Sequence, residues 1–186
     1  METKHEKILS AAFRLFHQHG FRKVTMSDLA DAAEMSRPTL YAAFSSKEAV
    51  FSAIAERQSE RCDAELAEKL PRAKTLDDKL SLIFEVWIVL PFASVIDSPN
   101  GLDLLGNAAV YAPEACADLY ARFEEHLRSA LAPAMTRRRG MSARDLSHIM
   151  MLATKGLKAS TTTLAELRRM TDGLIAMAVA TATSHA

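Results

Sequence analysis

The sequence predicts an all-α protein with an N-terminal three-helix domain and a larger C-terminal domain of antiparallel helices. Apolar residues recur at helical spacing along most of the chain, and Ser or Thr is repeatedly followed three residues later by Asp or Glu, the pattern of a helix N-terminus. No segment alternates polar and apolar residues as a half-buried strand would. We therefore expect residues 1–47 to form the first domain and residues 48–186 the second.

The composition is that of an ordinary globular protein. The chain has 186 residues, of which 49% are hydrophobic and 25% charged, and its formal net charge is zero. Residues 1–47 carry seven Lys and Arg against five Asp and Glu, a charge of +2, which is too small to indicate nucleic acid binding by itself. Cys62 and Cys116 lack the spacing of a zinc site or a disulfide framework, so we expect no metal, no cofactor and a reducing compartment.

The N-terminus and the most apolar run both favour a cytoplasmic protein. The N-terminus is charged and lacks the apolar core of a signal peptide. The run Leu80–Ile96 is interrupted by Glu85 and Pro91 and is shorter than the roughly 20 residues that cross a bilayer. We expect it to form a buried central helix, with no membrane partner. Glu85 within it has three interpretations: solvation at the helix surface, an ion pair with an arginine, or a contact with a cationic ligand.

The first helix has a clear beginning and a clear end. Thr3 and Glu6 form a capping box, and Gly20 supplies the left-handed conformation that closes a helix. Phe21 is placed to fold back on Phe16. The apolar stripe between these ends consists of Ile8, Ala11, Ala12 and Leu15.

The run from Val24 to Val50 predicts two short helices joined by a tight turn. Thr25 and Asp28 form a second capping box, Glu34 and Met35 turn the chain, and Ser36 caps the next helix. The inward stripe of the first helix is Met26, Leu29, Ala30 and Ala33, and that of the second is Leu40 and Phe44. Two such helices form a helix-turn-helix unit, whose second helix lies in the DNA major groove.

The outer face of the second helix has the chemistry that reads DNA. The planar fork of Arg37 can grip two acceptors of a guanine edge, Thr39 can donate or accept and has a methyl group for thymine, and the Tyr41 hydroxyl can reach a phosphate. Ser45 or Ser46 caps the next helix. Lys47 lies at its start, where its own charge and the helix dipole both attract a phosphate.

The remainder of the chain is helical in pattern as far as its last residues. We expect a helix from about Ser46 to Leu70 that links the two domains. Four further helices are expected: one from Thr75/Asp78 to about Asp97 that is bent near Pro91, one from Pro113 to the basic cluster Arg137–Arg139, and a final pair opened by Ser142/Asp145 and Thr163/Glu166. The basic cluster is expected to be a solvated helix end rather than a DNA contact.

The segment AAFRLFHQHGFRKVTMSDLADAAEMSRPTLYAAFSSKEAVFSAI resembles the DNA-binding region of the TetR family of one-component transcriptional regulators. The resemblance covers roughly residues 5 to 55 and rests on the order of its motifs, from the Gly-Phe stop through Ser-x-Pro-Thr-Leu-Tyr to Lys-Glu. It implies an all-helical, homodimeric repressor or activator that binds double-stranded DNA. In such proteins the larger C-terminal domain binds a small-molecule effector and forms the dimer.

The resemblance also implies roles for individual residues. Matching positions that contact DNA are Thr25 and Ser27 at phosphates, Arg37, Pro38, Thr39 and Tyr41 at bases and backbone, and Lys47 at a phosphate. Two positions depart from the family pattern. Glu34 replaces a common turn glycine, and Ala42 replaces a larger aromatic residue or histidine. These departures predict a slightly altered turn and a greater role for Arg37 in base reading.

Two sets of residues in the C-terminal domain are candidates for the effector pocket and the dimer interface. Aromatic residues in the region where the family encloses its ligand are Phe84, Trp87, Phe92, Tyr111 and Phe123. Apolar stripes on the last two helices are Leu146, Ile149, Met150, Ala153 and Leu157, and Leu164, Leu167, Thr171, Leu174, Ile175 and Ala178. The alternative for the aromatic residues is simple core packing, and the alternative for the stripes is an internal core face.

The sequence thus favours a DNA-binding regulator over an enzyme. No GxSxG elbow, phosphate loop, HExxH motif or paired-acid spacing is present to hold catalytic geometry. We expect a repressor that binds a near-palindromic operator as a homodimer and is released by a small molecule. The alternative is an adaptor or architectural DNA-binding protein with a protein partner and no effector.

Overall fold

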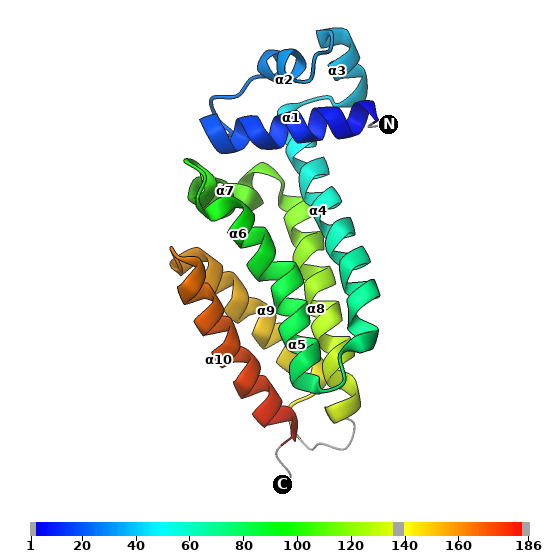
Figure 1. Cartoon of the computed structure of the whole chain (residues 1–186), viewed down its shortest axis with the longest axis vertical. Coiled ribbons are helices and arrows are strands. Elements are labelled where there is room, and N and C mark those ends of the chain that lie inside the picture. The colour runs from blue at the N-terminus through cyan, green and yellow to red at the C-terminus, as the bar shows by residue number, and fades with distance from the viewer. Residues whose placement is uncertain (1–2, 136–139, 184–186) are drawn as a thin grey trace. The chain divides into compact units, whose positions relative to one another are not determined.

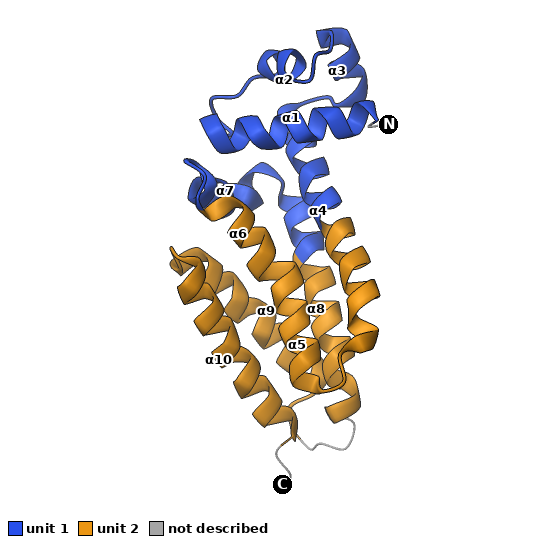
Figure 2. Cartoon of the chain, in the orientation of Figure 1, with its two compact units in different colours: residues 1–58, 97–119 blue, residues 59–96, 120–186 orange. Residues whose placement is uncertain are grey.

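The computed structural model describes residues 3–135 and 140–183, and every regular element among them is helical (Figure 1). Chain contacts divide these residues into two compact units (Figure 2). The N-terminal unit comprises residues 1–58 and 97–119, and the C-terminal unit comprises residues 59–96 and 120–186. The predicted all-α fold class is confirmed. The predicted functional boundary at residue 47 stays a prediction, because contacts group the chain by packing and not by role.

The N-terminal unit is built around the predicted three helices. Its elements are α1 (Lys4–His19), α2 (Met26–Ala32), α3 (Arg37–Ala43), the first part of α4 (Lys47–Lys69), α7 (Gly101–Tyr111) and the start of α8 (Pro113–Met135). The capping boxes at Thr3 and Thr25 both form, as the sequence predicts. Phe21 packs on Phe16 with ring centroids 5.2 Å apart, which closes α1 as expected.

Gly20 ends α1 in a conformation that other residues rarely adopt. Its φ is 82°, and its backbone N–H donates to the Phe16 carbonyl at 2.9 Å. A Cβ at this position would lie 3.0 Å from the Asn100 side-chain oxygen. The glycine is therefore required both by the backbone and by a neighbour from another part of the chain.

The C-terminal unit contains the remaining helices. They are the end of α4, η1 (Leu70–Arg72), α5 (Leu76–Phe84), η2 (Glu85–Val89), α6 (Leu90–Ile96), most of α8, α9 (Ala143–Ser160) and α10 (Leu164–Thr183). The capping boxes at Thr75 and Ser142 form, and Thr163 accepts the Glu166 backbone N–H at 3.2 Å. Arg137–Arg139, expected at the end of α8, lie outside the described residues.

The central helical run departs from regular α geometry before Pro91. Residues Glu85–Val89 form a π-helical turn, and α6 then begins at Leu90. Proline has no backbone N–H and its ring crowds the carbonyl four residues earlier. The helix runs on through Pro91, and the π-helical turn just before it is the kind of local departure that accommodates a proline inside a helix. The irregularity expected near Pro91 is therefore present, but as a widened turn that ends two residues before it.

The apolar run is longer than the sequence analysis expects, and its length matches that of a membrane span. The continuous helical segment Leu76–Ile96 has 21 residues and is, within the described ranges, one helix long and apolar enough to cross a membrane. Half of its most apolar window is buried inside the fold, where α5, η2 and α6 pack against α10. The core helix of a globular protein has the same properties, so the absence of a membrane partner stays a prediction.

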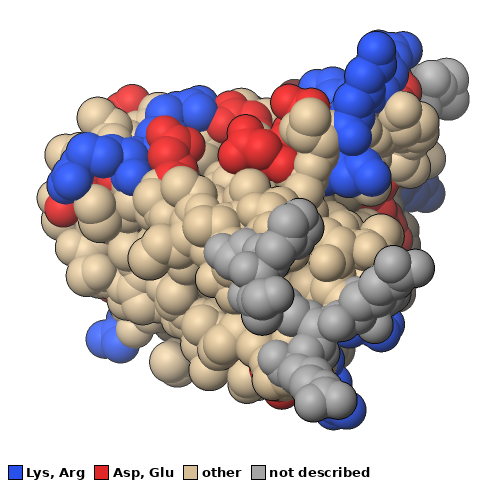
Figure 3. Space-filling view, turned by 90° about the horizontal axis from the view of Figure 1, so that it is seen from below, with Lys and Arg blue, Asp and Glu red and all other residues tan. Residues whose placement is uncertain are grey.

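The face drawn in Figure 3 carries charges of both signs. Figure 3 shows Lys and Arg mixed with Asp and Glu along one edge of this face, while uncharged residues form most of the surface not covered in grey. Mixed charges do not produce the single-sign field that attracts nucleic acid. This visible face is therefore a poor candidate for the DNA-binding surface.

Candidate nucleic-acid interface

The α2–α3 pair has a completely buried floor. Leu29, Ala30 and Leu40 are each 0% exposed, and Phe44 and Ala33 are also buried. Ser36 accepts the Thr39 backbone N–H at 3.3 Å and caps α3, with Pro38 in its first turn. The predicted helix-turn-helix therefore forms with the predicted inward faces.

The turn between the two helices contains a left-handed residue that is not glycine. Glu34 has a φ of 55°. The turn is closed by hydrogen bonds from the Glu34 N–H to the Asp31 carbonyl at 3.1 Å and from the Met35 N–H to the Ala30 carbonyl at 2.9 Å. This is the position where the sequence departs from a turn glycine. The turn keeps the left-handed conformation and carries the steric cost of a Cβ in it.

The predicted DNA-contacting residues of α3 lie on its outer side. Arg37, Pro38 and Tyr41 are exposed, and Tyr41 is 53% exposed. Arg37 Nη2 donates a hydrogen bond to the Ser27 hydroxyl of α2, which orients the guanidinium across the two helices. The guanidinium has further N–H donors for a base edge or a phosphate. The Thr39 hydroxyl lies 2.8 Å from the Ser36 hydroxyl.

Thr25 is held by the capping box at the start of α2. Its hydroxyl accepts the Asp28 backbone N–H at 3.2 Å and donates to the Asp28 carboxylate at 2.7 Å. The Thr25 hydroxyl and then its backbone N–H lower the pKa of Asp28, so this carboxylate is ionised at neutral pH. The exposed Thr25 therefore presents a fixed helix N-terminus, which is a suitable place for a phosphate.

Lys47 has a role that the sequence does not indicate. Its ammonium donates to the carbonyls of Phe21 at 3.0 Å, Val24 at 3.2 Å and Arg22 at 3.4 Å, and lies 4.6 Å from the centre of the Phe21 ring. An ammonium has three donors, so all are engaged. Lys47 fastens the loop between α1 and α2. The predicted phosphate contact would require it to share or release one of these bonds.

Comparisons with known proteins agree with this geometry. Residues 8–54 match the model of the family described as "Bacterial regulatory proteins, tetR family". Residues 8–54 therefore belong to the TetR family. Relatives of the chain include the HTH-type transcriptional repressor ComR of Escherichia coli, which is 33% identical over 107 residues. That alignment covers 57% of the chain and 50% of ComR, so the chain spans about half the length of this curated relative.

Solved structures share the fold over nearly the whole chain. A Rhodococcus protein of the TetR family covers 95% of this chain and 98% of its own, with a TM-score of 0.75 and 19% identity. The regulator FadR of Bacillus subtilis, solved with stearoyl-CoA, covers 96% of this chain and 98% of its own, with a TM-score of 0.71 and 15% identity. At these identities the two structures show that the fold is shared.

The end of α1 is held by the segment before α7. Asn100 Nδ2 donates to the carbonyls of His17 at 3.1 Å and Gln18 at 3.0 Å, and His17 Nδ1 lies 2.9 Å from the Ser98 hydroxyl. Burial lowers the pKa of His17. The partners are more than 80 residues apart, so no local pattern in the sequence could have revealed this contact.

The structure does not bring the five predicted pocket aromatics together. Phe84, Trp87, Phe92 and Phe123 are buried in the C-terminal unit, where Phe84 and Phe123 pack edge to face at 5.3 Å. Tyr111 belongs to the N-terminal unit instead and stacks on Phe21 with ring centroids 4.1 Å apart. Tyr111 and the other four therefore belong to different units.

A pocket of about 360 Å³ does lie in the C-terminal unit, between the α5–η2 segment and α10. Phe84 is the one member of the predicted aromatic set among its lining residues, which are Ser81, Leu82, Phe84, Glu85, Val89, Arg168, Thr171, Asp172 and Ile175. Glu85 pairs with Arg168 through two hydrogen bonds of 2.6 and 2.8 Å. Of the three interpretations of Glu85, the ion pair with an arginine is the one that forms.

The predicted dimer stripes mostly face the interior of the protomer. Six of the eleven residues are buried within the single chain: Leu146, Met150, Leu167, Thr171, Ile175 and Ala178. These six residues pack within the protomer, and their part in a dimer interface stays a prediction. Ile149 differs, because it is 47% exposed. Leu152 on α9 is 51% exposed and Met177 on α10 is 63% exposed, and we call these three exposed residues together the outer surface of α9 and α10.

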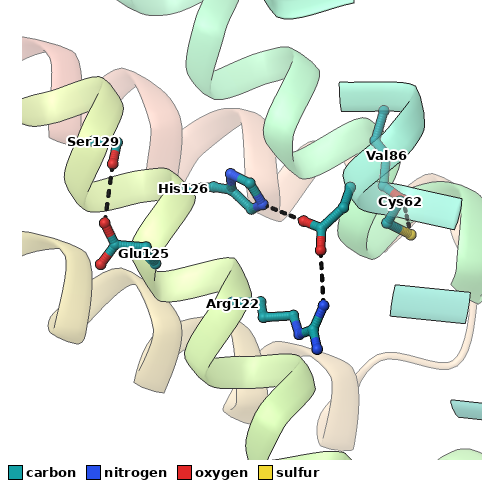
Figure 4. A network of polar contacts seen from close by, with 7 residues as sticks. Cys62, Val86, Arg122, Glu125, His126 and Ser129 are labelled. Carbon is teal, nitrogen blue, oxygen red and sulfur yellow. Dashed lines mark hydrogen bonds and ion pairs between the residues drawn. The ribbon is translucent and has the colours of Figure 1, made fainter. Parts of the chain in front are cut away.

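The C-terminal half of α4 is fastened to α8. The Asp63 carboxylate on α4 accepts from Arg122 at 3.0 Å and lies 2.6 Å from His126 Nε2, both on α8 (Figure 4). The Cys62 thiol donates to the Val86 carbonyl at 3.3 Å, which ties α4 to η2 as well. These contacts join the part of α4 that lies in the C-terminal unit to α8 and to the central helical run.

Proposed function

We propose that the protein is a sequence-specific transcriptional repressor that binds a near-palindromic operator as a homodimer and is released by a small-molecule effector. The observation that carries this proposal is the α2–α3 pair. The exposed Arg37 and Tyr41, with the half-buried Thr39 between them, lie over a buried floor inside the region that matches the TetR family. Such a helix enters the major groove, and the start of α2 contacts a phosphate. Lys47 reaches a second phosphate by sharing or releasing one of its three bonds to the loop between α1 and α2.

Dimerisation supplies DNA contacts that the weak basic bias of one chain cannot supply alone. Two copies place two α3 helices about one DNA turn apart, roughly 34–36 Å, and double the number of phosphate contacts. The outer surface of α9 and α10 supports this arrangement, since Ile149, Leu152 and Met177 are exposed there. Large apolar residues at this exposure are typical of a surface that a partner covers.

Effector release requires a path from the C-terminal unit to the reading helices. One support is α4, a single helix whose residues belong to both units. A second support is the set of hydrogen bonds from Ser98 and Asn100 to the end of α1. These bonds join the segment after α6 to the DNA-binding helices. A ligand that favours one arrangement of these elements shifts the population away from the DNA-binding form. The relative FadR, solved with stearoyl-CoA, supports a small-molecule effector in general.

Selection of bound duplexes from a random DNA library tests the DNA-binding part of the proposal. The full-length protein is used at about 150 mM salt, because phosphate contacts make both affinity and specificity depend strongly on salt. We expect enrichment of a near-palindromic site. Enrichment of a single half-site contradicts dimeric binding, and no enrichment favours an architectural protein or an adaptor with a protein partner. A repressor also predicts that the selected site lies at promoters, and that the protein lowers transcription from them. The proposal further places the protein in the cytoplasm.

A further inference from the structure

The pocket between α5–η2 and α10 has an apolar body and a polar mouth, and we name it the α5–α10 groove. Leu82, Phe84, Val89 and Ile175 line its body. Its volume of about 360 Å³ falls within the range of small-molecule sites, which begins near 300 Å³. The π-helical turn supplies Glu85 and Val89, and such turns occur often at functional sites.

The charges at the mouth of the groove leave one negative charge uncompensated. Arg168 donates to both oxygens of Glu85, and these hydrogen bonds, together with nearby Asp172, raise the pKa of the guanidinium. The pair therefore cancels its own charge. Asp172 lies one helical turn after Arg168 on α10, is exposed, and forms no salt bridge in the described part of the chain. The three charged residues of the groove thus sum to −1.

We infer that the α5–α10 groove binds a small amphipathic cation, an organic ammonium compound with an apolar body, and that this is the class of effector to which the protein responds. The apolar body lies against Leu82, Phe84 and Ile175, and the ammonium pairs with Asp172 at the mouth. The role of this ligand as an effector rests on the proposed function, whereas its binding to the groove can be measured without DNA.

An anionic ligand fits this groove less well. A carboxylate would have to displace Glu85 from a two-bond pair with Arg168 before it could be bound in the same way. The released Glu85 and the nearby Asp172 would then both face it with like charge. A neutral ligand of the same shape gains the apolar contacts but lacks the ion pair.

Three compounds with one phenylethyl body and different end groups test the charge preference. They are phenethylamine, 2-phenylethanol and 3-phenylpropionate, titrated into the full-length protein by calorimetry. Trp87 is the single tryptophan of the chain and lies in η2 with Glu85 and Val89, so its fluorescence provides a second readout. We expect phenethylamine to bind about threefold or more tightly than the alcohol, and the carboxylate to bind most weakly. Equal affinities, tighter binding of the carboxylate, or no binding of any compound overturns the inference.

Three variants locate the site. Asp172→Asn removes the charge at the mouth and should abolish the preference for phenethylamine over the alcohol. Asp77→Asn, the same change at another exposed aspartate, on α5 and outside the groove, should preserve it. Ser81→Phe fills the mouth from an exposed position and should weaken all three compounds. Unchanged binding by Asp172→Asn and Ser81→Phe places the ligand elsewhere and overturns the inference.

DNA measurements separate this inference from the proposed function. Phenethylamine is added to the complex with the selected operator, at a concentration that saturates the groove. Loss of operator affinity in the wild type but not in Ser81→Phe supports both the proposed function and the assignment of the effector class. Binding in the groove with unchanged operator affinity overturns the assignment of the effector class and leaves the DNA-binding function intact. A failed DNA selection overturns the proposed function without affecting the calorimetric result.

Discussion

Lys47 and Arg37 differ in how their side chains are already engaged, and this difference separates their roles. Lys47 holds three carbonyls of the loop between α1 and α2, whereas Arg37 makes one hydrogen bond, to Ser27. We expect Lys47→Met to lower the free energy of unfolding by about 1–2 kcal/mol, since hydrogen bonds from a charged donor are lost. Lys23→Met, a change of an exposed lysine in the same loop, should leave stability nearly unchanged. Urea denaturation of the three proteins measures this.

The same residues should differ in their effect on DNA binding. Arg37→Ala should weaken binding to the selected operator by roughly 1–3 kcal/mol and relax one base position, with little effect on a scrambled duplex. Lys47→Met should weaken both duplexes alike and reduce the salt slope by about 1. Fluorescence anisotropy over a salt series measures both quantities. Equal losses on both duplexes for both variants would show that the division into base reader and phosphate contact is wrong.

Glu34 is the residue at which a substitution should stabilise the protein. Its φ of 55° is left-handed, where a Cβ costs roughly 1–2 kcal/mol and glycine has no such cost. Glycine loses some of this gain through the greater entropy of the unfolded chain, so Glu34→Gly should stabilise by about 0.5–1 kcal/mol. Glu56→Gly, in the exposed middle of α4, should destabilise by about 1 kcal/mol instead. Melting temperatures that change in the same direction for Glu34→Gly and Glu56→Gly would contradict a steric cost at Glu34.

At the scale of helices, the sequence predicted where a helix begins better than it predicted which face of the helix is buried. Thr25 with Asp28 and Ser142 with Asp145 mark helix starts because a capping box acts between residues three positions apart. The stripes on α9 and α10 show only that a face is apolar, and both helices bury one apolar face while exposing another. Met150 and Ile149 are neighbours in sequence, yet one is buried and the other is exposed. Only the packing of the chain could distinguish core from outer surface.

The contact between α1 and the segment before α7 should make stability depend on pH. Burial lowers the pKa of His17, so the unfolded chain binds a proton at this residue more readily than the folded chain does. The contribution is therefore fully present above the unfolded value of about 6.5 and is lost as the pH falls through the lowered folded value. Urea midpoints of the wild type at about pH 7.5 and pH 5 should differ more than those of His17→Gln. Equal differences for the two proteins would mean that other groups cause the pH dependence.

At the scale of the whole molecule, the family resemblance predicted more of the candidate site than the residue pattern did. The outward row on α3 follows from local spacing together with the family order of motifs. The sequence pattern did not predict the stacking of Tyr111 on Phe21, because these residues are 90 positions apart and an aromatic residue alone does not reveal its partner. The α5–α10 groove was missed for the same reason. Its ion pair joins Glu85 to Arg168, and only the position of Glu85 within an apolar run gave a signal.

The outer surface of α9 and α10 leads to the last prediction, which concerns the assembled protein. If two copies cover Ile149, Leu152 and Met177, the wild type has about twice the 20.4 kDa mass of the chain in light scattering after gel filtration. Leu152→Glu should give a monomer, because an unpaired charge in a dry interface costs several kcal/mol. Leu102→Glu is the matched control, since Leu102 is 47% exposed on α7 and should leave the dimer intact. The monomer should also lose most of its affinity for a near-palindromic operator while it retains weak half-site binding, because each copy then contributes its contacts alone. A Leu152→Glu protein that stays dimeric would place the interface on another surface.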